Sequence, residues 1–152
     1  MRRFALWMST GLGIGYIPFA PGTFGTLWGA LLFYLSRDLP WQLTAGAILL
    51  FILFSVYCAQ RAEEALGGHD SSRIVIDEVA GYLVAVIAIP FSWRTLLLAF
   101  LLFRLFDIAK PYPIRHIDRR WGGGWGVVMD DVLAGVFSNL SLRLIMWVWG
   151  IL

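Results

Sequence analysis

Charged residues are scarce in this chain of 152 residues, where they make up 14% of the sequence and hydrophobic residues make up 59%. Soluble domains carry roughly 25% charged and 45–50% apolar residues. A soluble domain of this length has too much surface for its volume to bury so many apolar side chains. The composition therefore excludes an ordinary soluble protein and predicts a chain that is covered by lipid.

Cysteine and net charge are also low. Cys58 is the one cysteine, so it has no partner for an intramolecular disulfide, and we expect a small core residue. The formal net charge of +2 gives no indication of a nucleic-acid partner. The length fits one domain, which we expect over residues 1–152 and for which the sequence gives no oligomeric state.

Apolar residues fall into five segments, and no alternating strand pattern interrupts them. The segments cover residues 22–36, 43–60, 74–91, 95–109 and 127–152. The second and fifth reach the roughly 17–25 residues that a membrane-spanning helix needs, whereas the first and fourth are short. We therefore predict an all-α fold, a compact bundle of four to five largely transmembrane helices.

Basic residues predict the orientation of this multi-pass bundle, because they concentrate on the cytoplasmic side of membrane proteins. With a cytoplasmic N-terminus, the basic residues on that side are Arg2, Arg3, Arg61, Arg73, Lys110, Arg115, Arg119 and Arg120. The other side keeps Arg37 and Arg94. The same topology places Asp70, Asp77, Glu78, Asp107, Asp118, Asp130 and Asp131 at the cytoplasmic face, although acidic residues were not used to derive it.

Two acidic pairs begin similar motifs, Asp77-Glu78-Val79-Ala80-Gly81 and Asp130-Asp131-Val132-Leu133-Ala134-Gly135. Acids at a helix start are favoured by the helix dipole, which is one interpretation. Carboxylates inside apolar runs are also typical of cation sites, and the glycine one turn later lets another backbone approach closely. Carboxylate oxygens suit Mg²⁺, so the two pairs together indicate two halves of a metal site.

A third motif contains Arg104, Asp107 and Lys110, which are spaced three apart and so share one helical face before Pro111 ends the helix. This face can bind phosphate through Arg104 and Lys110 while Asp107 reaches the metal. The alternative is a structural ladder of ion pairs.

A Gly/Thr segment, residues 21–27, opens the first apolar segment and is a possible anion site at a helix N-terminus. Thr23 or Thr26 can equally be a simple N-cap. Asp70, which follows His69, remains open as a metal ligand, a base or a solvated loop acid.

The four motifs, in this order, resemble the phosphatidylglycerophosphatase A family. The matching segments are residues 21–26, 74–81, 103–114 and 129–135, which are distributed over most of the chain. The resemblance implies an enzyme of the bacterial cytoplasmic (inner) membrane that hydrolyses the phosphomonoester of phosphatidylglycerophosphate with Mg²⁺. The products are phosphatidylglycerol, which places the reaction in phospholipid biosynthesis, and phosphate.

Carried onto this chain, the resemblance assigns roles to particular residues. Asp77, Glu78, Asp107, Asp130 and Asp131 are the expected metal ligands, and Asp77, Glu78, Asp107 and Asp131 the expected catalytic residues. Thr23, Thr26, Arg104 and Lys110 are expected to bind the phosphate of the anionic phospholipid. Direct attack by water and attack by a carboxylate to form an aspartyl-phosphate both fit these residues.

A cation-coupled membrane transporter is the alternative from a different class of proteins, because acids within membrane helices also serve carriers. The acids of this chain gather at one end of the helices, whereas transport sites usually lie near the midplane of the bilayer. The distribution of the acids therefore favours the enzyme.

Overall fold

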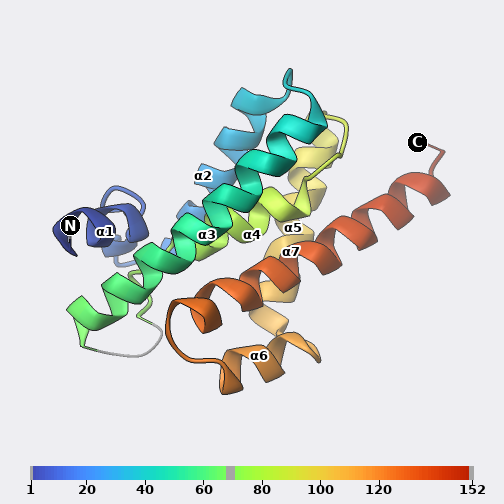
Figure 1. Ribbon diagram of the computed structural model, residues 1–152. Helices are drawn as coiled ribbons and strands as arrows, with labels where there is room; N and C mark the ends of the chain where they lie inside the picture. The colour runs from blue at the N-terminus through green and yellow to red at the C-terminus, as the bar shows by residue number, and fades with distance from the viewer. Residues whose placement is uncertain (1, 68–70, 151–152) are drawn as a thin grey trace.

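The computed structural model describes residues 2–67 and 71–150, and the regular elements within these residues are all helical. They are α1 (Arg2–Ser9), the 3₁₀ turn η1 (Ile14–Tyr16), α2 (Pro21–Ser36), α3 (Trp41–Leu66), α4 (Ile76–Ala85), α5 (Trp93–Ala109), α6 (Ile114–Arg120) and α7 (Gly123–Val148) (Figure 1). The predicted all-α fold is therefore confirmed.

Helices α3 and α7 have 26 residues each, which corresponds to about 39 Å at 1.5 Å per residue. These two are long and apolar enough to cross a membrane, and they correspond to the second and fifth predicted segments. Helices α2 and α4 have 16 and 10 residues, fewer than the roughly 17 that a membrane-spanning helix needs, and α5 with 17 residues lies at that lower limit and is not among the candidate spans. The predicted bundle of four to five transmembrane helices is thus only partly confirmed.

The centre of the fold is the contact between α4 and α7, and it depends on two glycines. A Cβ on Gly81 would lie 2.5 Å from the carbonyl oxygen of Asp131, and a Cβ on Gly135 would collide with the carbonyl oxygen of Gly81. Only glycine permits this backbone approach. The close contact expected of the glycine in each acidic motif is therefore present, and the two motifs face each other.

Aromatic and aliphatic side chains from α4, α5 and α7 fill the space on one side of this contact. Tyr82, Phe103 and Leu142 are fully buried there, and the Tyr82 hydroxyl donates a hydrogen bond of 3.0 Å to the carbonyl of Leu96. Cys58 is fully buried in a second cluster, which confirms it as a small core residue.

Helix α4 ends at Ala85, earlier than the predicted segment, and side chains from α7 hold its C-terminal end. The Asn139 side-chain amide donates to the carbonyls of Ala85 and Ile87 at 2.9 and 3.0 Å. Arg143 donates to Asn139 Oδ1 at 2.8 Å and to the carbonyls of Ile87 and Ala88 at 3.1 Å. These two side chains, the Asn139–Arg143 clasp, satisfy the carbonyl of Ala85, which the helix end leaves without an intrahelical partner, and two carbonyls of the segment that follows α4.

One predicted helix end is confirmed, whereas one helix was not foreseen. Helix α5 ends at Ala109, and its C-cap Lys110 is the residue before Pro111, which was expected to end the helix. Helix α6 lies in a stretch that the sequence indicated only as a basic connection, and it packs against the first half of α7.

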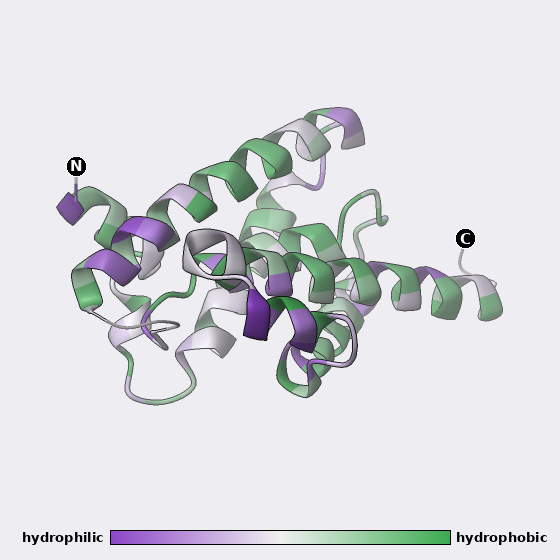
Figure 2. Ribbon diagram, turned by 60° about the horizontal axis from the view of Figure 1, so that its bottom comes forward, coloured by the Kyte–Doolittle hydropathy of each residue, from purple (hydrophilic) through white to green (hydrophobic). Residues whose placement is uncertain are grey.

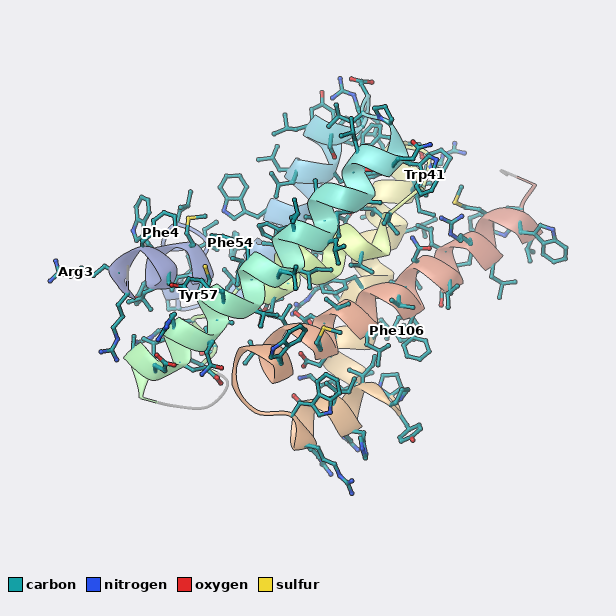
Figure 3. All side chains as sticks on the ribbon, in the orientation of Figure 1. Arg3, Phe4, Trp41, Phe54, Tyr57 and Phe106 are labelled. Atoms are coloured by element: carbon teal, nitrogen blue, oxygen red, sulfur yellow. The ribbon has the colours of Figure 1, made fainter. Side chains whose placement is uncertain are left out.

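The surface is rich in large apolar side chains. Most of the helical ribbon is formed by hydrophobic residues, and several of the hydrophilic ones lie near helix ends (Figure 2). Phe4, Trp41 and Tyr57 point away from the body of the protein, and 45–59% of each residue is exposed (Figure 3). Extended exposed apolar surface is typical of a protein that contacts a membrane or another protein.

Candidate active site

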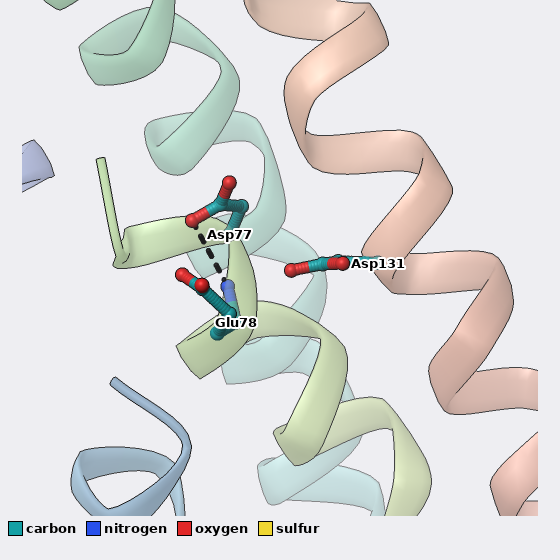
Figure 4. Close-up of side chains that lie close together, drawn as sticks. All are labelled: Asp77, Glu78 and Asp131. Atoms are coloured by element: carbon teal, nitrogen blue, oxygen red, sulfur yellow. Dashed lines mark hydrogen bonds between the residues drawn. The ribbon is translucent and has the colours of Figure 1, made fainter. Parts of the chain in front are cut away.

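Three acidic side chains from α4 and α7 converge next to the glycine contact. Asp77, Glu78 and Asp131 each offer a carboxylate oxygen, and these oxygens all lie within 4.8 Å of one another. Figure 4 shows Asp77 and Glu78 on the first turn of α4 and Asp131 pointing toward them from α7. We call these three residues the carboxylate triad.

The two acidic motifs occupy different positions in their helices. Asp77 and Glu78 lie in the first turn of α4, and Asp77 Oδ1 accepts a hydrogen bond of 3.1 Å from the Glu78 N–H. Asp130 and Asp131 lie in the third turn of α7, which begins at Gly123, so the prediction of acids at two helix starts is wrong for this pair. The helix dipole acts mainly within the first turn and therefore does not account for Asp131.

Burial disfavours the ionised form of the three carboxylates unless a cation accompanies them. Asp77 and Asp131 are 8% and 4% exposed, and Glu78 Oε2 is buried without a hydrogen-bond partner. Clustered buried carboxylates repel one another and need either a proton or a cation. Two oxygens bound to one Mg²⁺ lie at most about 4.2 Å apart, given bond lengths of 2.0–2.1 Å. The oxygens of the triad therefore fit a shared Mg²⁺ after a small side-chain adjustment.

Arg104 and Asp107 form a close ion pair beside the triad. Arg104 Nη1 lies 2.6 Å from Asp107 Oδ2, and both side chains are largely buried. Asp107 is within electrostatic range of all three carboxylates of the triad. The structure thus places Asp107 near the predicted metal ligands, but it is neutralised by its own arginine.

The N-terminus of α2 also lies beside the carboxylate triad and Arg104. A Cβ on Gly22 would collide with Glu78 Oε1 and would lie 3.1 Å from Arg104 Nη1. The Thr26 hydroxyl is buried and donates to the Gly22 carbonyl at 2.9 Å, whereas Thr23 is half-buried. The N-cap residue is Ala20, so neither threonine is the N-cap, and their role in binding phosphate stays a prediction.

Lys110 does not continue the face of Arg104 and Asp107. Its Nζ lies 2.7 Å from Asp130 Oδ2 and 2.5 Å from Asp118 Oδ1, so it joins the end of α5 to α7 and α6. Burial lowers the pKa of Lys110, but the hydrogen bonds and charges of Asp118 and Asp130 outweigh it and hold that pKa above its ordinary value. Lys110 is therefore a cation that two carboxylates already neutralise.

The sequence placed Asp118 at the cytoplasmic face but indicated no role for it, because it lies in a basic stretch without apolar context, whereas the structure pairs it with Lys110. Asp130, although next to Asp131 in the chain, turns toward Lys110. His69 and Asp70 lie outside the described residues.

Comparisons with known proteins agree with this arrangement. The family model described as Phosphatidylglycerophosphatase A matches residues 7–146. The phosphatidylglycerophosphatase A of Escherichia coli is 38% identical over 95% of this chain and 86% of its own length. The protein of the same name from Haemophilus influenzae is 40% identical over 86% of this chain and 82% of its own length.

A further relative has a different name. A Bacteroides thetaiotaomicron protein, provisionally named a phosphatidylinositol-3-phosphatase, is 40% identical over 94% of this chain and 94% of its own length. No solved structure matches the chain. The family match covers the four motifs on which the resemblance rested, and it includes the whole of the carboxylate triad. The chain therefore belongs to the phosphatidylglycerophosphatase A family and is a phosphatase.

Proposed function

We propose that this protein hydrolyses the phosphomonoester of phosphatidylglycerophosphate, which yields phosphatidylglycerol and inorganic phosphate, as a step in phosphatidylglycerol biosynthesis. The observation that carries the proposal is the family match over residues 7–146. The carboxylate triad supports it, because a buried cluster of oxygen ligands is what a metal-assisted phosphatase needs.

In this proposal the triad binds Mg²⁺, which supplies Lewis-acid neutralisation of the phosphoryl oxygens. A cation held there would give the buried Glu78 Oε2 the partner that it lacks. Asp107 and Asp130 were also expected to bind metal, and that role stays a prediction. Their ion pairs with Arg104 and Lys110 support a different role, in which they orient these two cations next to the triad.

The substrate phosphate lies, in this proposal, between the triad, Arg104 and the first turn of α2. The positive end of the α2 dipole and the Arg104 guanidinium both favour an anion there. Gly22 leaves room, since any side chain at this position would collide with Glu78. During hydrolysis an oxygen–phosphorus bond forms, the bond to the glycerol oxygen breaks, and that oxygen takes up a proton.

We further propose that α3 and α7 cross the bacterial inner membrane, with the triad at the cytoplasmic face. The excess of arginine and lysine on that side of the predicted topology and the exposed apolar surface support this placement. Membership of a phosphatase family favours this enzyme over the cation-coupled transporter.

The direct test measures phosphate release from phosphatidylglycerophosphate by the purified protein in detergent, with Mg²⁺ or with EDTA. The Asp131→Asn variant removes one charge of the triad while it keeps the size of the side chain. Asp38→Asn is the matched control, because the Asp38 side chain is 83% exposed and lies outside the site. Phosphatidylinositol 3-phosphate is assayed in parallel, since one relative carries that name.

We expect Mg²⁺-dependent release by the wild type and by Asp38→Asn, and a loss of about 100-fold or more in Asp131→Asn, as for other electrostatic contacts to a transition state. A folded protein that releases no phosphate from phosphatidylglycerophosphate contradicts the proposed substrate. Faster release from phosphatidylinositol 3-phosphate would replace it with an inositol lipid.

A further inference from the structure

A cavity of about 290 Å³ lies at the far end of α4 from the carboxylate triad. Helices α2 and α3 form its walls, and the end of α4 with the segment that follows forms its floor. The side chains that define it are Leu32 and Phe33 from α2, Ile48 and Phe51 from α3, and Leu83 and Val86 from the floor. We call it the apolar pocket.

The polar side chains of the apolar pocket already have partners in the backbone nearby. Ser36 donates to the Phe33 carbonyl at 3.2 Å, Arg37 to the Tyr34 carbonyl at 2.9 Å, and Thr44 to the Trp41 carbonyl at 2.9 Å. The remaining lining is almost wholly aliphatic and aromatic. Such a pocket suits a hydrocarbon and not a polar ligand.

The position of the apolar pocket matches the reach of one lipid chain. Leu83 and Val86 lie five and eight residues after Glu78, which is about 8 and 12 Å along the helix at 1.5 Å per residue. One leaflet of the hydrocarbon core is about 15 Å deep, half of its roughly 30 Å thickness. A lipid with its phosphate at the triad therefore has acyl carbons at the depth of Leu83 and Val86, whereas Arg37, at the other rim of the pocket, belongs to the far side of the predicted topology.

We propose that the apolar pocket binds an acyl chain of the phospholipid whose phosphate is held at the carboxylate triad. This inference rests on the proposed function, since it takes the occupant to be the substrate. An acyl chain gains little hydrophobic energy by leaving the bilayer, so the pocket acts through close packing, which holds the lipid in one orientation relative to the triad.

The test uses a non-hydrolysable phosphonate analogue of phosphatidylglycerophosphate that carries a diazirine in the outer half of one acyl chain. It is photo-crosslinked to the protein in detergent micelles with Mg²⁺, and mass spectrometry locates the label. Competition uses a tenfold excess of unlabelled phosphatidylglycerophosphate or of phosphatidylcholine with the same chains. Phosphate release from phosphatidylglycerophosphate is measured on the same preparation.

We expect label on pocket residues of α2 and α3, reduced about fivefold or more by the substrate lipid and little by phosphatidylcholine. Ala47→Trp, which places a large ring in the pocket lining, is expected to reduce this label similarly, whereas Leu50→Trp, 69% exposed and outside the pocket, is not. Thermal unfolding confirms that both variants fold.

Two results overturn the inference. Label that phosphatidylcholine displaces as well as the substrate does would mean that the pocket takes bulk lipid, and label spread over the Leu50 face would mean that the chain lies elsewhere. Phosphate release without any label in the pocket contradicts the acyl-chain assignment and leaves the proposed function standing. Displacement by the substrate lipid without any phosphate release contradicts the proposed function and leaves the pocket assignment standing.

Discussion

The two ends of the α4–α7 helix pair treat buried polar groups in opposite ways. At one end, Asp77, Glu78 and Asp131 gather like charges and leave Glu78 Oε2 without a hydrogen bond. At the other end, the Asn139–Arg143 clasp donates hydrogen bonds to the last carbonyl of α4 and to carbonyls of the segment that follows it. Satisfied buried groups are typical of structural roles, whereas clustered unsatisfied ones indicate a ligand. We therefore infer that the triad end binds a ligand and that the clasp end stabilises the fold.

Asp131→Asn should have the largest effect of these substitutions, and it should act only at the triad end. We expect phosphate release to fall about 100-fold or more, because the proposed metal site would lose one of its charges. The melting temperature in EDTA should not fall, since the substitution relieves repulsion between buried carboxylates. Phosphate assays and thermal unfolding of the same samples test both expectations. A fall in the melting temperature that matches the loss of activity would contradict a purely functional role for Asp131.

Gly135→Ala should damage both ends, because the new methyl group pushes the Gly81 backbone of α4 away from α7. We expect the free energy of unfolding to fall by about 1–3 kcal/mol, as for overpacked cores. Phosphate release should fall about tenfold or more, since Asp131 moves away from its partners on α4. The control is Gly46→Ala, where a Cβ meets no atom within 4 Å. Wild-type activity in Gly135→Ala would show that the spacing of α4 and α7 does not matter.

Asn139→Ala tests the clasp end. It removes the Asn139 hydrogen bonds to the carbonyls of Ala85 and Ile87 and a partner of Arg143, which should cost about 1–3 kcal/mol in free energy of unfolding. We expect phosphate release per folded molecule to stay within a few-fold of wild type. The exposed amide Gln42→Ala is the control. Unchanged stability in Asn139→Ala would show that the clasp contributes nothing.

Lys110→Met is expected to have the smallest effect, because the Lys110 side chain is 25% exposed and solvent screens part of its charge. We expect a loss of about 1–2 kcal/mol in stability, since Asp130 loses its partner. Adding Asp130→Asn should restore part of that loss, and denaturant unfolding of the three variants measures the coupling. A rise in KM without any change in stability would instead make Lys110 a phosphate ligand.

The long apolar helices and the meeting of the two acidic motifs could be predicted from the sequence, because both depend on local pattern. The stretches that form α3 and α7 are long and mostly apolar, and Gly81 and Gly135 follow Asp77 and Asp131 by one helical turn. Both an apolar run and a glycine one turn after an acid can be recognised within a single segment of the sequence.

Features that depend on distant partners could not be predicted in this way. Helix α4 ends at Ala85 because its carbonyls meet Asn139, 54 residues later. Lys110 leaves the face of Arg104 because Asp118 and Asp130 attract it, and neither pairing follows from helical spacing. Helix α6 lies between Pro113 and Gly122 and has too few residues to show a periodic pattern.

Mn²⁺ binding tests the central claim most directly, because this ion reports the carboxylate triad without any substrate. Electron paramagnetic resonance of the protein titrated with Mn²⁺ counts the bound ions and gives their affinity. We predict saturable binding that Mg²⁺ displaces in the wild type and in Asn139→Ala, and binding weakened at least tenfold in Asp131→Asn. Equal binding by the wild type and Asp131→Asn would contradict the assignment of the triad as the metal site.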